Sequence, residues 1–243
     1  MTLTLLVPLA CLLLLAGALQ RLSGIGYALV ASPGLLAAVG PDEAVRLVAV
    51  TSIASCAVGI ATTWRESRPF EACALVPFAL LAIVPAGYFA AAVGDGVATL
   101  LCGLIVLPAL AMALRPPRRM ERVPRWLGAV VAGSFSGAMN AVAGLGGPMA
   151  ASYGMSRRWG AALVPNMQLF LLLSAFGVVV VRGWPDQVGN GDLLVLSLSA
   201  AVGVAAGGGL SARVTSRTAG AVTVAVAITG AGVAIVRGVA AIV

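Results

Sequence analysis

The chain has 243 residues, of which 60% are hydrophobic and 9% are charged. A soluble domain carries about 25% charged residues on a polar exterior, so this composition excludes a soluble globular fold and indicates a membrane protein with several spans. The net charge of +7 comes from arginines grouped between apolar stretches. That placement orients spans in a membrane, so no nucleic-acid partner is expected.

Eight stretches are long and apolar enough to cross a membrane, which takes about 20 helical residues. In chain order they are 3–20, 45–62, 72–92, 96–114, 127–143, 161–181, 192–209 and 217–237. The first has no basic residue before its apolar core, as a signal peptide would have, so we expect a true span. Two shorter glycine-rich pieces, 24–39 and 144–156, are expected to be broken or re-entrant segments buried in protein.

The sequence repeats itself once, without gaps, at an offset of 120 residues. Glycines coincide under this offset more often than 30 Gly in 243 residues would by chance. The matched pairs are Gly17/Gly137, Gly24/Gly144, Gly26/Gly146, Gly34/Gly154, Gly40/Gly160 and Gly87/Gly207. We therefore predict an all-α polytopic membrane protein made of two repeats, 1–114 and 126–243. The linker at 115–125, rich in Pro and Arg, is expected to be cytoplasmic.

The arginines bear on whether the two short pieces cross the membrane. If they do not cross, five arginines fall on one side, against nine on the other; the five are Arg46, Arg157, Arg158, Arg213 and Arg217. If both cross, each half has five membrane segments, and Arg46, Arg182 and Arg237 stand opposite a large arginine excess. Because positive charge favours the cytoplasmic side, we predict the second arrangement in a cell (inner or plasma) membrane. The halves are then inverted, and both termini lie outside.

Glycines interrupt the chain at matched positions in the two halves. Glycine permits positive φ, and a helix broken there exposes N–H groups at its positive end. Two such ends facing each other would form an anion site at mid-membrane. The alternative for these glycines is close helix packing. The candidate substrate-binding residues are Ser23, Gly24, Gly26, Tyr27, Arg46, Asn140, Gly144, Gly146, Gly147 and Asn166.

Polar side chains inside the predicted spans are few. Asn140 and Asn166 are amides that cost free energy in lipid unless they are paired, and each flanks the second glycine motif. Arg46 begins a span after the first motif, where it would attract an anion or reach out to the interface. There is no His, and the acidic residues lie in loops or at span ends. The sequence therefore indicates no metal site, no cofactor, no proton relay and no enzyme mechanism.

The second glycine motif and the span before it carry a family resemblance. Gly133-Ser134-Phe135-Ser136-Gly137 followed by Gly144-Leu145-Gly146-Gly147-Pro148 resembles the signature of TauE/SafE sulfite exporters. The first half is similar, with Ser23-Gly24-Ile25-Gly26, Pro33, Gly40-Pro41 and Thr51-Ser52. Two departures stand out: Gly26-Tyr27-Ala28 in place of a glycine triplet, and Asn166-Met167-Gln168 where the first half has the Thr-Ser pair. They leave room for a substrate other than the family's better-known ones.

The resemblance implies movement of small sulfur-containing or organic anions such as sulfite, sulfonates or sulfoacetate. We predict a secondary transporter, an exporter or permease, that works by alternating access between the two halves. Its expected partners are the anion and the lipid bilayer, and a homodimer is left open. The alternative is a non-catalytic scaffold or a permease subunit of a larger complex.

Overall fold

The computed structural model describes the chain except residues 25, 115–120, 211–215 and 242–243. The described residues form helices and no strand, which confirms the predicted all-α class. The short 3-10 helices are η1 (Trp64–Glu66) and η3 (Gly160–Ala162). The α-helices are α1 (Leu3–Ser23), α2 (Gly26–Val39), α3 (Pro41–Thr63), α4 (Pro69–Cys73), α5 (Val76–Ala92), α6 (Asp95–Leu114), α7 (Arg125–Ala143), α8 (Gly147–Ser156), α9 (Leu163–Arg182), α10 (Asn190–Leu210) and α11 (Ser216–Ala240).

Eight helical segments within the described residues are long and apolar enough to cross a membrane, as predicted. The third helix begins earlier than the apolar pattern alone indicated, at Pro41 instead of residue 45. Proline suits the first turn of a helix, where its missing N–H needs no partner. Asp42 and Glu43 follow in that turn, where carboxylates favour the positive helix end. These polar residues extend the helix beyond its apolar part.

The two glycine-rich pieces form helices that are too short to cross a membrane alone. The α2 helix has 14 residues, which at 1.5 Å per residue gives about 21 Å. The α8 helix has 10 residues, or about 15 Å, against a hydrocarbon core of about 30 Å. Most α2 side chains are buried, among them Tyr27, Leu29, Val30 and Leu35. As expected for such segments, the short helices are surrounded by protein.

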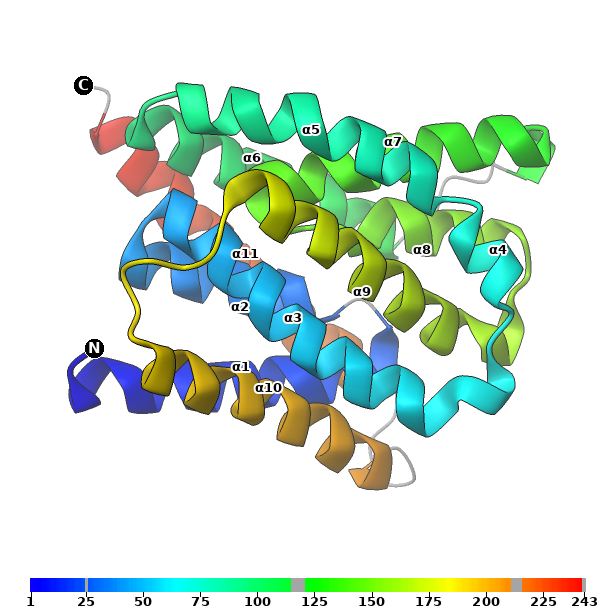
Figure 1. Cartoon of the computed structure of the whole chain (residues 1–243), viewed down its shortest axis with the longest axis horizontal. Helices are drawn as coiled ribbons and strands as arrows, with labels where there is room; N and C mark the ends of the chain where they lie inside the picture. Colours follow the sequence, from blue (N-terminus) through cyan, green and yellow to red (C-terminus); the bar gives the residue numbers. More distant parts are fainter. Residues whose placement is uncertain (25, 115–120, 211–215, 242–243) are drawn as a thin grey trace.

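Helix contacts occur in pairs that the 120-residue offset relates to each other. The α1 helix packs against α10, and its match α7 packs against α5. The α2 helix packs against α11, and its match α8 packs against α6. The matched helices α3 and α9 pack against each other, as do α6 and α11. The third long helix of each half, α5 or α10, therefore lies against the first helix of the other half (Figure 1).

The matched glycines Gly17 and Gly137 serve this packing. A Cβ added at Gly17 would meet the backbone oxygen of Ala200 in α10. A Cβ added at Gly137 would meet the backbone oxygen of Ala79 in α5. Neither backbone can yield easily, so glycine lets each helix pair approach closely. For this pair, helix packing is the correct interpretation.

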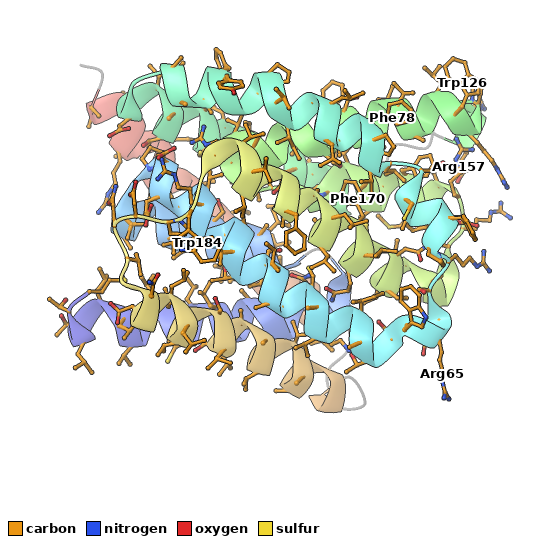
Figure 2. The ribbon with its side chains drawn as sticks, viewed as in Figure 1. Arg65, Phe78, Trp126, Arg157, Phe170 and Trp184 are labelled. Atoms are coloured by element: carbon orange, nitrogen blue, oxygen red, sulfur yellow. The ribbon has the colours of Figure 1, made fainter. Side chains whose placement is uncertain are left out.

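The matched helices α3 and α9 lie antiparallel. Asp42 at the start of α3 accepts a hydrogen bond from Arg182 at the end of α9, at 2.6 Å. At the opposite end, Asn166 in α9 accepts one from the backbone N–H of Arg68, beyond α3, at 2.7 Å. The start of α1 and the end of α11 lie at one end of the molecule (Figure 1), and Arg65 lies at the other (Figure 2).

Candidate functional site

A small cavity lies between the two breaks in the helices. It is lined from the first half by α1, α2 and α3 and from the second half by α7, α8 and α9. Its lining residues are Gln20, Tyr27, Ala28, Ala49, Ser52, Asn140, Gly144, Gly147, Leu171 and Ala175. The volume open to the centres of water molecules is about 10 Å³, roughly the space that one water needs. The cavity is therefore closed around a space smaller than any substrate anion.

The two breaks have the same backbone geometry. Gly24 and Gly144 take left-handed conformations with φ of 79° and 70°. The N–H of Gly24 donates to the carbonyl of Gln20 at 2.6 Å, and that of Gly144 to the carbonyl of Asn140 at 2.9 Å. A side chain at either glycine would be strained, because L-residues rarely adopt this conformation. The breaks at Gly24 and Gly144 occur where the glycine pattern predicts them.

These caps place two amide side chains at equivalent positions, one turn before each break. Gln20 and Asn140 are related by the 120-residue offset, and both line the cavity. The Gln20 amide donates from Nε2 to Oε1 of Gln168 at 2.9 Å, which joins α1 to α9. Asn140 Nδ2 donates to Ser174 Oγ at 3.3 Å. The sequence interpretation singled out Asn140 but missed Gln20, although the offset that pairs them was available.

Two buried amide atoms beside the cavity have no partner among the described residues. They are the oxygen Oε1 of Gln20 and the nitrogen Nε2 of Gln168, and both side chains are fully buried. A buried amide group without a partner costs about 1–3 kcal/mol. One is an acceptor and the other a donor, so water, or an occupant with a hydroxyl group that both donates and accepts, would satisfy them.

The short helix α8 begins at this cavity. Gly146 precedes it without a side-chain cap, and Gly147 at its start lines the cavity. Pro148 carries no N–H, and the N–H of Ala150 donates to Ser136 Oγ at 2.9 Å. On the opposite side, α2 begins at Gly26, and Tyr27 and Ala28 of its first turn line the same cavity. Two positive helix ends thus converge on one buried space.

The hydroxyl groups around the cavity bond mainly to protein. Tyr27 donates to Thr51 Oγ1 at 2.6 Å, and Thr51 donates to the carbonyl of Leu47 at 2.6 Å. Ser55 donates to the carbonyl of Ser52 at 3.0 Å. Thr51 and Ser55 thus bond to carbonyl groups of their own helix, as hydroxyl side chains in helices commonly do. Ser52 lies 3.7 Å from Cys56 Sγ and lines the cavity.

The structure brings only some of the predicted site residues together. Tyr27, Asn140, Gly144 and Gly147 line the cavity, while Gly24, Gly26 and Gly146 form the adjoining breaks. Ser23 ends α1, and its side chain lies outside the described part of the structure.

Arg46 and Asn166 do not line the cavity and so are not placed at this site. Arg46 lies at the end with the chain termini and pairs with Asp42 at 2.5 Å and with Asp186 at 2.8 Å. Arg46 is only three residues before Ala49 of the cavity lining, but its guanidinium is bound by these carboxylates and is not part of the lining. Asn166 is bonded to the backbone of Arg68 instead. Both residues therefore contribute to contacts that close the two ends of the α3–α9 pair.

The end of the molecule near the chain termini is closed by charged groups. Arg182 is nearly buried and bonds to Asp42 at 2.6 Å and to the carbonyl of Gly87 at 3.0 Å. Glu43 accepts hydrogen bonds from the backbone N–H groups of Asp186 and Gln187, at 3.3 and 3.0 Å. In the part of the chain that the structure describes, no group of three His, Cys, Asp or Glu residues could hold a metal ion.

Eight apolar spans and two half-length helices around a small buried cavity are typical of a multi-pass membrane transporter. The family model of the sulfite exporter TauE/SafE matches residues 9–236. The chain therefore belongs to the TauE/SafE sulfite exporter family. No curated protein and no solved structure matches the chain.

Proposed function

We propose that the protein is a secondary transporter, an exporter or permease, of small anions such as sulfite, sulfonates or other sulfur-containing and organic anions. The observation that carries the proposal is the convergence of two helix starts and two matched amides, Gln20 and Asn140, on one buried cavity. Helix N-termini are suited to binding anions, and Asn140 adds an amide N–H group beside them. The N–H groups of Gln20 already donate to Gln168 and Cys56, so Gln20 shapes the lining instead. The membership in a sulfite exporter family supports the same class of substrate.

The charge of the site favours singly charged anions. None of the described residues that line the cavity carries a formal charge. The two helix ends contribute about +0.5 elementary charge each, which together match one negative charge. Taking an ion out of water costs many kcal/mol by Born solvation, and this cost rises steeply with the charge. A monoanion such as hydrogen sulfite or a sulfonate is therefore preferred to a dianion such as sulfate.

The proposed mechanism is alternating access between two inverted halves. Two observations support it. The helices α3 and α9 pack antiparallel, and they are joined by the Asp42–Arg182 contact at one end and the Arg68–Asn166 contact at the other. The arginine-rich end, with Arg65 and Arg157, is then cytoplasmic, and the termini lie outside, which places the protein in the cell membrane. In this scheme the cavity opens to one side when the Arg68–Asn166 contact breaks, and to the other when the Asp42–Arg182 contact breaks.

A substitution at the start of α8 tests the proposal. Leu at Gly147 adds four carbons to a cavity with room for about one water, so anion flux into proteoliposomes should be abolished. Gly146→Leu should act in the same way, because an added Cβ already lies 3.0 Å from Asn140. The matched control is Gly232→Leu in α11, where an added Cβ meets nothing within 4 Å. Unimpaired flux in both cavity variants would refute the proposed site.

A scaffold or a permease subunit of a larger complex is the competing function. Reconstitution of the purified chain alone separates the two. A transporter moves its anion without further proteins, whereas a scaffold or subunit stays inactive until its partner is added.

A further inference from the structure

A second, larger cavity opens at the arginine-rich end of the molecule. It lies between α4, the start of α7 and the end of α8, and its volume is about 350 Å³. Two arginines, Arg125 and Arg157, and the aromatic residues Phe70, Trp126 and Tyr153 line it. Figure 2 shows Trp126 and Arg157 together at this end of the bundle. The size is within the range of small-molecule sites.

Among the described residues that line this cavity, positive charge exceeds negative charge. Arg125 is the first residue of α7, a helix whose first turn has neither an acidic residue nor a side-chain cap. A cation at a helix N-terminus is unfavourable by about 0.3–1 kcal/mol. Arg157 donates to the carbonyl of Val123 at 2.7 Å and lies 5.2 Å from the Tyr153 ring centre, yet its Nε atom is buried without a partner. The uncapped first turn of α7 and two arginines therefore belong to the lining of one cavity.

One acidic residue shares the cavity and does not neutralise it. Glu71 lines the same space, and its carboxylate lies 3.6 Å from the guanidinium of Arg68. Because both side chains are exposed, this pair is weak. Among the described residues, Glu71 forms no ion pair with either arginine of the cavity.

The aromatic wall of the cavity is exposed on the side of the protein. Phe70 is 92% exposed and Trp126 is 68% exposed. In a membrane protein, aromatic side chains at the ends of spans lie at the level of the lipid headgroups. Arginine beside such a belt attracts the anionic lipids of the cytoplasmic leaflet. An occupant with an acyl chain and a negative headgroup would contact the aromatic residues with the first and the arginines with the second.

The first half has no equivalent of this cavity lining. Under the 120-residue offset the matched pairs are Arg125/Leu5, Trp126/Leu6, Tyr153/Pro33 and Arg157/Ala37. All four are apolar, so the basic aromatic lining is not a product of the duplication. It lies at the arginine-rich end of the molecule, as a site for lipid from one leaflet would.

We propose that this cavity binds the headgroup of an anionic phospholipid. Its phosphate is held by the guanidinium groups of Arg125 and Arg157 and by the N-terminal N–H groups of α7. The acyl chains lie along Phe70 and Trp126. The site is separate from the central cavity and does not depend on which anion, if any, the protein transports.

Lipid titration of the purified chain in detergent micelles tests this site. Phosphatidylglycerol should raise the unfolding temperature more than phosphatidylcholine does, because a ligand of the folded state stabilises it. Arg125→Gln should weaken phosphatidylglycerol binding by about tenfold, the value of one charged hydrogen bond. Arg65→Gln is the matched control, since Arg65 lies at the same end but outside the cavity (Figure 2).

Native mass spectrometry of the same samples, which counts retained lipids, provides a second readout that does not rely on unfolding. Arg125→Lys keeps the charge and should retain part of the binding. Equal stabilisation by both lipids, or an undiminished phosphatidylglycerol effect in Arg125→Gln, would overturn the proposal. A rise in unfolding temperature with inorganic phosphate alone that equals the rise with phosphatidylglycerol would also overturn it, because the site would then bind a soluble anion.

Discussion

The hydrogen bond between Gln20 and Gln168 links the two halves at the central cavity and yields a sharp prediction. Both side chains are fully buried, and the donor and acceptor lie 2.9 Å apart. Hydrogen bonds between transmembrane helices average only about 0.6 kcal/mol. An amide left buried without its partner costs more, about 1–3 kcal/mol. The orphaned partner, and not the lost bond, should therefore dominate the effect of a single substitution.

Gln20→Leu should accordingly destabilise the protein by about 1–3 kcal/mol, because Gln168 loses its partner. In the double variant Gln20→Leu with Gln168→Leu, both amides are gone, and most of that loss should be recovered. The coupling between the two substitutions should be about 1–2 kcal/mol, within the range for residues in contact. Equilibrium unfolding in detergent of the wild type, the two single variants and the double variant measures this coupling.

Anion flux separates stability from binding in the same set of variants. The double variant should regain stability without regaining flux, because the amide that lines the cavity is still missing. Additive losses of stability would show that the hydrogen bond does not couple the two residues. Flux at the wild-type rate in the double variant would show that Gln20 serves packing alone.

Two further predictions concern the breaks and the charged end. Gly24→Ala and Gly144→Ala should each cost about 1–2 kcal/mol from left-handed backbone strain. The cost should be larger at Gly144, where an added Cβ lies 3.0 Å from a valine side chain of α3, against 3.6 Å for the nearest contact at Gly24; the reverse order of unfolding temperatures would contradict this. Asp42→Asn should destabilise more than Arg182→Met, because it leaves the buried guanidinium without its carboxylate. Thermal unfolding compares these two variants, and a larger loss in Arg182→Met would count against the argument.

The sequence was sufficient to predict the spans and the breaks because these depend on local composition. A run of apolar residues has to be helical in lipid, where no water can satisfy the backbone. Gly24 and Gly144 stand at the ends of such runs, and their positive φ follows from the absence of a side chain. The 120-residue offset between Gly24 and Gly144 pairs the two positions in the sequence alone.

The partners of individual side chains could not be predicted in the same way. Arg46 looked equally suited to an anion or to the interface, and its pairing with Asp186 depends on a loop far along the chain. The bond between Gln20 and Gln168 likewise joins residues 148 positions apart. Nor does composition show whether the cavity is open, since closure depends on how α3 and α9 pack against each other.

Uptake of labelled sulfite by proteoliposomes that contain only this chain tests the central claim most directly. The account predicts saturable uptake that methanesulfonate, a monoanion, inhibits more strongly than sulfate, a dianion. Uptake should also rise as the pH is lowered and hydrogen sulfite replaces sulfite. Uptake no greater than in empty liposomes would contradict transport by this chain. Stronger inhibition by sulfate than by methanesulfonate would contradict the preference of the site for singly charged anions.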